Sequence, residues 1–341
     1  PGGKKTKSGG FSTNERVLRD IMKSHPAVEK ILEYRELNKL NSTYTFALID
    51  KVNKKTNRIH ANFNQAVTST GRLSSNNPNL QNIPISSEKA NKIRKAFEAD
   101  EGNVLLGLDI AQQELRVVSV LSREEKLIQA FKNSQDIHAL TASEVFGIPI
   151  ESVDSEKRRV GKTLNFSLLY GISAFGLSDR LKMSREESQE MIDKFWQGYP
   201  NIKKYFDNLL LEAREKGYAE TYFGRRRSAA GLSSKNFQIR SATEREIINF
   251  PIQGTSAELM KLAMIAVDEY IDENELELNP KIILQVHDEL ILEIKNISEK
   301  KTAELAGILK ARMEGVIDFE VPLLVEPKTG HDWSNMKNIN I

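Results

Sequence analysis

Hydrophobic residues recur at helical spacing along much of the chain. The spacing predicts helices in four stretches: residues 14–40, about 123–216, 242–272 and 298–314. Proline fixes the backbone and lacks an N–H group, so Pro26 should divide the first stretch and Pro251 and Gly254 should interrupt the third. Within the second stretch the expected breaks are Gly171, Gly176, Gly198 and Pro200.

Extended segments alternate with these helices. Residues 104–110 form a short hydrophobic run typical of a buried strand, and residues 281–294 show two hydrophobic runs around a polar turn, which predicts a β-hairpin. A further strand is expected over residues 319–326, and residues 59–84 should form an ordered loop or short strands. The order of elements indicates an α+β fold with a central helical insertion.

Composition narrows the chemistry. Of the 341 residues, 39% are hydrophobic and 28% charged, as in ordinary globular proteins with more than one subdomain. The absence of cysteine excludes disulfides and thiolate metal sites, so any metal must be held by oxygen or imidazole. No run of 18 hydrophobic residues occurs, so no membrane helix is expected. Residues 1–10 predict a flexible tail, and the initial proline indicates that an upstream part was removed.

The net charge of +2 hides an uneven distribution. Residues 1–60 carry 13 lysines and arginines against 6 acidic residues, and residues 151–245 carry 18 against 13. The acidic excess lies in residues 101–150 and 246–341. This distribution favours a protein that binds a polyanion with one part and cations with another. Random variation of surface charge would produce it as well.

Three acidic residues lie at the ends of predicted strands. Asp109 is near the end of the strand 104–110, and Asp288 and Glu289 occupy the turn of the predicted hairpin. A carboxylate at the edge of a buried strand is costly unless it is compensated. Two aspartates can bridge two Mg²⁺ ions about 4 Å apart, an arrangement used for phosphoryl displacement. Acidic residues are also common in turns, so the pattern alone leaves both interpretations open.

Eight segments of the chain, taken together and in order, match the motifs of one protein family. Three of them are DIAQQELR (109–116), RRVGKTLNFSLLYG (158–171) and QVHDE (285–289). The other five are residues 70–84, 136–147, 223–227, 245–264 and 330–333. These segments resemble the motifs of family A DNA polymerases, the bacterial DNA polymerase I type. The resemblance covers nearly the whole chain from about residue 14.

The resemblance implies a right-hand polymerase fold with an antiparallel-sheet palm, helical fingers and a partial helical thumb. The thumb and tail would comprise residues 1–60, the fingers residues 116–239, and the palm residues 61–115 and 240–341. The proofreading and 5′-nuclease modules of the family lie upstream of the polymerase part. No nuclease activity is therefore expected from this chain.

The implied activity is template-directed DNA synthesis, in which dNTPs are added to a primer 3′-hydroxyl and pyrophosphate is released. Asp109 and Asp288 would bind two Mg²⁺ ions, Glu289 and His287 would lie beside them, and Lys162 would be a further catalytic residue. The implied partners are primer–template DNA and dNTPs, with no membrane and a monomeric chain. The expected location is cytoplasmic, near the nucleoid, for a bacterial or phage protein, and organellar for a eukaryotic one whose targeting segment was lost.

Four residues of the segment 158–171 recur at every fourth position: Arg158, Lys162, Phe166 and Tyr170. Each step of four advances about 40° around a helix, so the set forms a stripe on one side. The resemblance implies that the two cations contact the triphosphate, Phe166 the sugar and base, and Tyr170 the template position. Without it, a helix with a basic solvated end and core aromatic residues is the alternative.

The resemblance assigns roles to further residues around the nucleotide and the DNA. Glu114 would leave no room for a ribose 2′-hydroxyl, and His138 and Gln112 would contact the nucleotide. Donor side chains in the minor groove can check base-pair geometry, because purine N3 and pyrimidine O2 are acceptors in every correct pair. The residues expected to contact DNA are Arg72, Arg245, Asn249, Gln253, His287, Asn79, Gln81, Asn82 and Lys39.

The chain departs from the family motifs at Ile110, Ala111, Gln113, Gly161 and Ser167. None of these changes removes a carboxylate or a phosphate-binding cation, and Gly161 should weaken its helix by up to about 1 kcal/mol relative to alanine. Two other interpretations stay open. One is a non-catalytic nucleic-acid-binding module with a polymerase shape, and the other is a single-subunit RNA polymerase, against which Glu114 argues.

The identity of Phe166 generates a first prediction. In this family a phenylalanine at this position accompanies rejection of dideoxynucleotides, whereas tyrosine accompanies their acceptance. We expect Phe166→Tyr to raise dideoxynucleotide incorporation in a primer-extension assay that compares both forms at equal dNTP concentration. Equal incorporation by the two forms would contradict the role assigned to Phe166.

Overall fold

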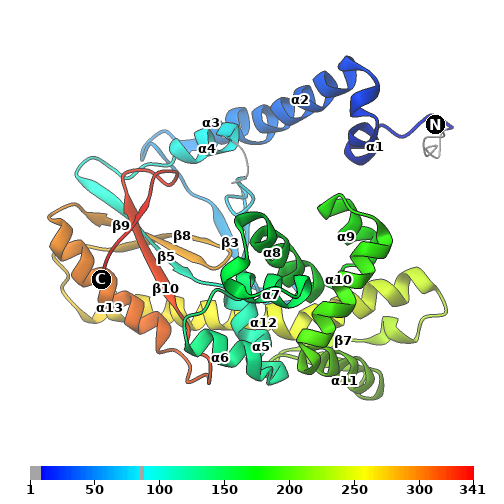
Figure 1. Cartoon of the computed structure of the whole chain (residues 1–341). Helices are drawn as coiled ribbons and strands as arrows, with labels where there is room; N and C mark the ends of the chain where they lie inside the picture. Colours follow the sequence, from blue (N-terminus) through cyan, green and yellow to red (C-terminus); the bar gives the residue numbers. More distant parts are fainter. Residues whose placement is uncertain (1–8, 85–87) are drawn as a thin grey trace. The chain divides into compact units, whose positions relative to one another are not determined.

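The computed structural model describes residues 9–84 and 88–341, so most of the predicted tail lies outside it. The chain divides into two compact units, drawn in one view in Figure 1. Unit 1 comprises residues 1–64, 75–98 and 332–334, and unit 2 comprises residues 65–74, 99–331 and 335–341. In the described part of the chain, no helix is both long and apolar enough to cross a membrane.

Unit 1 consists of helices and short strands. Its helical segments are α1 (Glu15–Asp20), η1 (Met22–Ser24), α2 (Pro26–Leu40), η2 (Asn41–Thr45), α3 (Phe46–Ile49) and α4 (Glu88–Lys95). Its two-stranded pairs are β1 (Val52–Asn53) with β2 (Arg58–Ile59), and β3 (Asn62–Asn64) with β4 (Ser74–Asn76). Pro26 is the first residue of α2, where a missing N–H costs nothing, so the predicted division is confirmed.

Trp333, from the last family-like motif, belongs to unit 1. Its ring meets the edge of Phe97 at 5.9 Å between centroids, and the Arg94 guanidinium lies 4.0 Å from its centroid. The Trp333 N–H also donates to the Phe97 carbonyl at 2.9 Å. This segment therefore contributes packing to unit 1.

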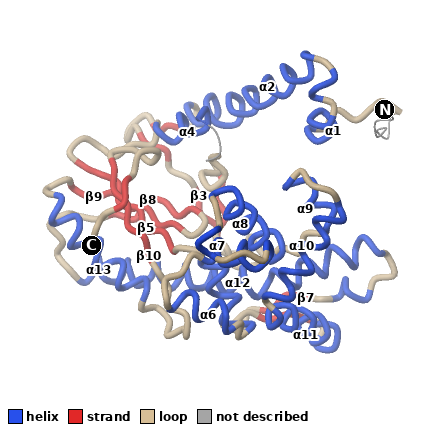
Figure 2. The backbone as a smooth tube through the Cα atoms, viewed as in Figure 1, coloured by secondary structure: helices blue, strands red, loops and turns tan. Residues whose placement is uncertain are grey.

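A five-stranded antiparallel sheet in the order β11-β10-β5-β9-β8 forms one part of unit 2 (Figure 2). Its strands are β5 (Asn103–Ile110), β8 (Lys281–Val286), β9 (Glu289–Lys295), β10 (Val325–Gly330) and β11 (Lys337–Asn338). The predicted strand 104–110 and the predicted hairpin are confirmed. The strand expected over 319–326 starts only at Val325, because Val325 pairs with Ile110, where β5 ends.

Helices make up the rest of unit 2, and Figure 1 shows α12 and α13 beside the sheet and α7, α8 and α10 grouped together. The helical segments are α5 (Gln113–Ser122), α6 (Glu125–Lys132), α7 (Ile137–Phe146), η3 (Ile150–Ser152), α8 (Ser155–Leu169), α9 (Ala174–Leu181), α10 (Arg185–Gly198), α11 (Pro200–Lys216), η4 (Ala230–Ser233), α12 (Phe237–Glu273) and α13 (Glu299–Glu314). A hairpin of β6 (Tyr218–Glu220) and β7 (Arg226–Ser228) lies between α11 and α12 in the chain. The predicted breaks at Gly171, Gly198 and Pro200 are confirmed, but Gly176 lies inside α9.

The prediction that Pro251 and Gly254 interrupt a helix was wrong, because α12 runs through both residues. Phe250, Pro251 and Ile252 are all buried, so tertiary packing offsets the hydrogen bond that proline cannot make. Gly254 also serves packing, since a Cβ atom there would lie 2.4 Å from Thr221 Cγ2. The core of the unit selects a helix that local propensity disfavours.

Helix α8 packs closely on α7 through Gly161. A Cβ atom at Gly161 would lie 2.2 Å from the backbone oxygen of His138 and 3.0 Å from the backbone nitrogen of Ala142. Buried Leu164 and Leu168 lie on the same helix. The glycine therefore does more than loosen α8, because it allows the two helix backbones to approach each other.

Helix propensity alone predicts that replacing Gly161 with alanine stabilises the protein, whereas this contact predicts that it destabilises it. We expect Gly161→Ala to lower the free energy of unfolding by about 1–3 kcal/mol, because the methyl group overlaps backbone atoms. The matched control is Gly307→Ala in α13, where the nearest atom is Ile341 Cγ2 at 3.1 Å and stabilisation by about 0.5–1 kcal/mol is expected. Urea unfolding of the three proteins measures both changes. A Gly161→Ala variant as stable as wild type would refute the packing argument.

Candidate active site

Two aspartates lie near each other at the end of the five-stranded sheet where the central strand β5 finishes. Asp109 is the last residue of β5 that pairs with β9, and it lies directly opposite Glu289. The N–H of Ile110 donates to the backbone oxygen of Asp288 at 2.9 Å, so the end of β5 and the β8–β9 turn lie side by side. The structure thus brings Asp109 next to Asp288 and Glu289, which the sequence placed in the turn of a distant hairpin.

The turn that carries Asp288 has a defined backbone. His287, the first turn residue, has a left-handed φ of 54°, which is uncommon for a residue other than glycine. The Gln285 side chain donates from Nε2 to the His287 carbonyl at 2.6 Å and holds this conformation. The His287 side chain is exposed, and Asp288 follows it at the base of the turn.

Negative charge is concentrated around Asp288. Burial, together with the charges of Glu114 and Asp109, raises the pKa of its carboxyl group to about 6, and the charge of Arg72 opposes this rise. A carboxylate in this position is costly to ionise unless a cation compensates it. The site therefore favours a positively charged ligand.

The donor set fits a magnesium site that a substrate completes. Within residues 9–84 and 88–341, no three His, Asp or Glu side chains are grouped so as to hold a metal by themselves. Mg²⁺ is usually bound through one or two carboxylates together with water and substrate phosphates, and Asp109 and Asp288 supply two carboxylates. These residues suit a metal that arrives with a phosphorylated ligand.

Glu114 links three segments of the chain beside the aspartates. It lies in the first turn of α5 and is 6% exposed. One carboxylate oxygen accepts a hydrogen bond from Arg72 Nη2, and the other accepts one from the Tyr170 hydroxyl. Burial and the charge of Glu114 raise the pKa of Tyr170. The carboxylate is thus held in one orientation by a cation and a phenol.

The predicted stripe on α8 has the expected geometry. Arg158, Lys162 and Tyr170 are exposed and Phe166 is half-buried. The buried residues of the helix are Gly161, Leu164, Asn165, Ser167, Leu168 and Leu169. Cations therefore occupy the first half of the outer face and aromatic rings the second half.

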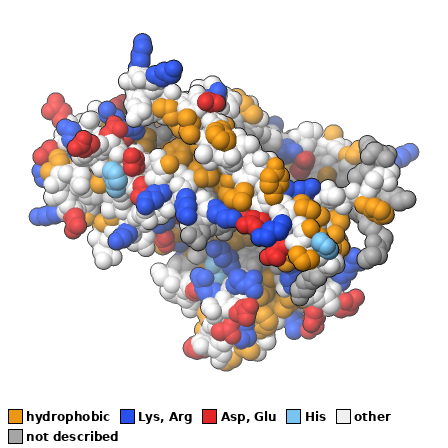
Figure 3. Space-filling model, turned by 90° about the horizontal axis from the view of Figure 1, so that it is seen from above, with side chains coloured by type: hydrophobic (Ala, Val, Ile, Leu, Met, Phe, Trp, Pro, Cys, Tyr) orange, Lys and Arg blue, Asp and Glu red, His pale blue; other side chains and the backbone are white. Residues whose placement is uncertain are grey.

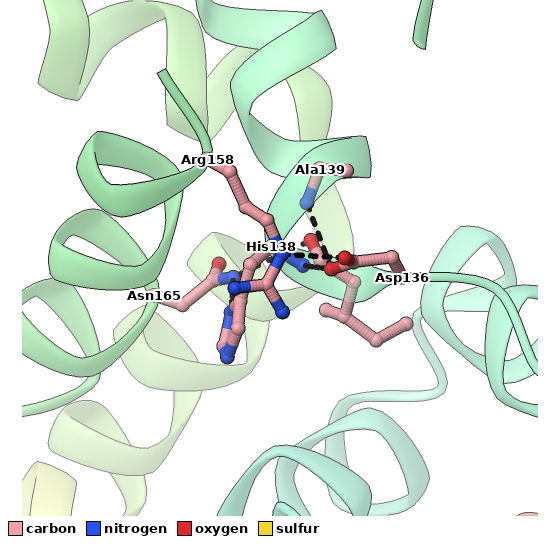
Figure 4. A network of polar contacts seen from close by, with 6 residues as sticks. Asp136, His138, Ala139, Arg158 and Asn165 are labelled. Carbon is pink, nitrogen blue, oxygen red and sulfur yellow. Dashed lines mark hydrogen bonds and ion pairs between the residues drawn. The ribbon is translucent and has the colours of Figure 1, made fainter. Parts of the chain in front are cut away.

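A polar network connects the start of α8 to the start of α7 (Figure 4). Asp136 caps α7 by accepting from the N–H groups of His138 and Ala139, and its other oxygen accepts from Arg158 Nε. Partial burial raises the pKa of Asp136, but the hydrogen bonds from Arg158 and the backbone outweigh it, so the pKa lies below its ordinary value. Arg158 is therefore paired with a carboxylate that is itself held by the first turn of α7.

His138 is buried next to this pair and is neutral. Asn165 Oδ1 accepts from Thr141 Oγ1 at 2.9 Å, so Asn165 Nδ2 faces His138 Nδ1 at 3.1 Å and donates to it. A proton on Nδ1 would abolish this bond. Burial, followed by the charge of Arg158, lowers the pKa of His138 to about 4. Its ring also lies 5.8 Å from that of Phe166.

Further predicted contact residues line the same part of unit 2. Arg245, Asn249 and Gln253 recur at every fourth position of α12, and Arg245 packs beneath Gly171 at the end of α8. The buried side-chain oxygens of Asn249 and Gln112 have no hydrogen-bond partner in the described part of the chain. Buried polar atoms of this kind are usually satisfied by water or a ligand.

Four predicted DNA contacts lie in unit 1: Lys39, Asn79, Gln81 and Asn82. Lys39 is exposed in the last turn of α2. The Asn79 side chain accepts from the N–H of Gln81 at 3.0 Å, and the Asn82 carbonyl accepts from the Tyr44 hydroxyl. These residues hold a loop in a fixed shape, and their contact with DNA stays a prediction.

Sequence reasoning missed three residues of the site. Asp136 and Asn165 lie within the family-like segments, and the helix-capping pattern at Asp136 was a usable signal. Lys328 of β10 lies 3.2 Å from Asp109 Oδ2. No sequence signal pointed to Lys328, because its position depends on strand register.

The sequence pattern of DNA polymerase family A matches residues 1–335. The chain belongs to DNA polymerase family A. It is 46% identical over 336 residues to the thermostable DNA polymerase I of Thermus aquaticus. The aligned region covers 98% of this chain and 39% of that protein. The DNA polymerase I of Pseudomonas aeruginosa is 43% identical over 330 residues, covering 96% of this chain and 36% of that protein.

A solved structure supports the same family. The polymerase domain of Pol1 from M. smegmatis, in complex with DNA primer–template and dNTP, matches with a TM-score of 0.90 and 39% identity. The match covers 98% of this chain and 58% of that one. This family A chain thus spans less than half the length of the curated relatives above. The α+β polymerase fold expected from sequence is confirmed, while the site residues stay predictions.

The buried, neutral His138 makes stability depend on pH. The folded-state pKa is about 4 and the ordinary value is 6.5, so the unfolded chain binds the proton more tightly. This contribution to stability is fully present above pH 6.5 and is lost as the pH falls toward 4, by about 3 kcal/mol. Urea unfolding from pH 7.5 to 4 should show that His138→Gln lacks this loss.

The matched control is His60→Gln, which changes an exposed histidine. It should unfold with the pH dependence of wild type. A His138→Gln variant that loses the same stability as wild type between pH 7.5 and 4 would show that His138 is protonated in the folded protein.

Proposed function

We propose that this chain catalyses template-directed DNA synthesis, adding dNTPs to a primer 3′-hydroxyl with release of pyrophosphate. The observation that carries the proposal is the meeting of Asp109 and Asp288 at one sheet edge in a chain of DNA polymerase family A. The Pol1 structure, which contains primer–template DNA and dNTP, supports the choice of substrates. The activity needs no protein nucleophile, in agreement with a chain that has no cysteine.

Asp109 and Asp288 are the proposed ligands of two Mg²⁺ ions. Bound there, the metals would lower the pKa of the primer hydroxyl and neutralise charge on the phosphates. The raised pKa of Asp288 supports this assignment, because the carboxylate gains from a nearby cation. Glu289 lies opposite Asp109 and extends the acidic edge.

The outer face of α8 is the proposed nucleotide site. Arg158 and Lys162 would bind the triphosphate, and Phe166 would lie against the sugar and base. Arg158 must exchange its bond with Asp136 for one with phosphate, which is favourable because phosphate offers more charge and a bidentate geometry. His138 is held neutral beside it and would present Nε2–H as a donor.

Glu114 is the proposed sugar gate. Its carboxylate is buried and hydrogen-bonded on both oxygens, so it cannot move aside without breaking the bonds from Arg72 and Tyr170. A fixed side chain excludes an added hydroxyl more strictly than a mobile one. The proposed discrimination against ribonucleotides thus depends on this three-residue network.

Basic surface residues are the proposed contacts for the DNA backbone. Figure 3 shows Lys and Arg side chains exposed among hydrophobic and acidic ones. Arg72, Arg245, Asn249, Gln253 and His287 are proposed to contact the primer end and minor groove. The assignment of residues 1–60 to a thumb, 116–239 to fingers and the remainder to a palm is likewise a proposal.

A primer-extension assay with dNTPs or rNTPs tests the function. We expect extension with dNTPs in Mg²⁺, and a fall of at least about 10²-fold in Asp288→Ala, the range for losing one group that stabilises transition-state charge. Preference for rNTPs would favour an RNA polymerase instead. No extension by the intact protein would favour a non-catalytic nucleic-acid-binding module.

Asp268→Ala is the matched control, because Asp268 is an exposed aspartate on α12. It should extend primers at the wild-type rate. Equal rates for Asp288→Ala and Asp268→Ala would refute the proposed metal site while leaving the family assignment intact.

A further inference from the structure

Lys328 reaches the first catalytic aspartate from a neighbouring strand. In the pairing of β10 with β5, Glu326 lies opposite Asp109 and Lys328 opposite Gly107. Residues two apart on a strand share a face, so Lys328 is the diagonal neighbour of Asp109. Its Nζ atom lies 3.2 Å from Asp109 Oδ2, within ion-pair distance.

The ion pair between Lys328 and Asp109 is partly exposed to solvent, and other side chains pack beside it at Gly107. The Lys328 and Asp109 side chains are 27% and 35% exposed. A Cβ atom at Gly107 would lie 2.9 Å from Glu289 Oε1 and 3.0 Å from Met336 Cε, so the glycine leaves room for both. Lys328 therefore meets a face already crowded with acidic groups.

The charges divide into two pairs. Arg72 is bonded to Glu114, and Lys328 is bonded to Asp109. In the described part of the chain, Asp288 forms an ion pair with neither of these two cations. One of the two proposed metal ligands is thus already neutralised by the chain itself.

We propose that Lys328 is a positioning residue whose ammonium group holds the Asp109 carboxylate. Acting as an internal counter-cation to Asp109, it weakens divalent-cation binding until a nucleotide is present. The inference rests on the proposed function, since it concerns the metal site assigned there. A divalent cation at Asp109 must displace the ammonium group or remain beside it, and both are unfavourable. Nucleotide phosphates bring negative charge that offsets this repulsion, so metal and nucleotide should bind cooperatively.

The proposal is tested by measuring the binding of Mn²⁺ to the whole chain by electron paramagnetic resonance, in the absence of DNA. We expect Lys328→Gln to lower the Kd for Mn²⁺ by about tenfold without nucleotide, at the low end of the effects of groups that contact metal ligands. With dATP the difference from wild type should shrink. Lys328→Arg keeps the charge and should bind Mn²⁺ like wild type.

Lys337→Gln controls for the loss of one positive charge, because Lys337 is exposed on β11. It should leave the Kd unchanged. Thermal unfolding in EDTA verifies that the variants are folded. A Lys328→Gln variant that binds Mn²⁺ like wild type overturns the proposal, and so does a Lys328→Arg variant that behaves like Lys328→Gln.

Asp109→Asn and Asp288→Asn separate this result from the proposed function. Each substitution should abolish the binding of Mn²⁺ to the protein that wild type shows in the presence of dATP. If they bind Mn²⁺ like wild type, the proposed metal site fails and the role of Lys328 fails with it. If they lose binding while Lys328→Gln is unchanged, only the role of Lys328 fails.

Discussion

Antiparallel pairing of β5 with β9 is the constraint on which the site depends. The pairing puts Asp109 opposite Glu289 and lets the Ile110 N–H bond to the Asp288 carbonyl. Fully buried leucines on both strands stabilise this register, because a slip of one residue would turn them to the opposite face. The hydrophobic core thus keeps two like charges together that would otherwise repel each other.

The concentration of acidic groups explains the arrangement of cations around it. Arg72 bonds to Glu114 and Lys328 to Asp109, so these two carboxylates obtain a cationic partner from a distant segment. Asp288 is the exception, and its raised pKa reflects the cost. Sites of this kind trade stability for the ability to bind a charged ligand.

Helix α8 shows how much of the fold follows from sequence. Its periodicity predicted both the helix and the exposed stripe, because spacing by four determines which residues share a face. The role of Gly161 did not follow, since helix propensity describes only the local backbone. Contact with His138 and Ala142 of α7 decides its effect. Pro251 differs from expectation for the same reason, because buried neighbours keep α12 continuous.

The sequence by itself determined the residue types of the site, the order of the family motifs, the buried strand and the hairpin. These depend on local periodicity and on segments short enough to compare directly. The tertiary structure alone decided the pairing of Glu114 with Tyr170, 56 positions away, and of Asp109 with Lys328, 219 positions away. Such contacts depend on strand register and helix packing, which the whole core sets and no local pattern encodes.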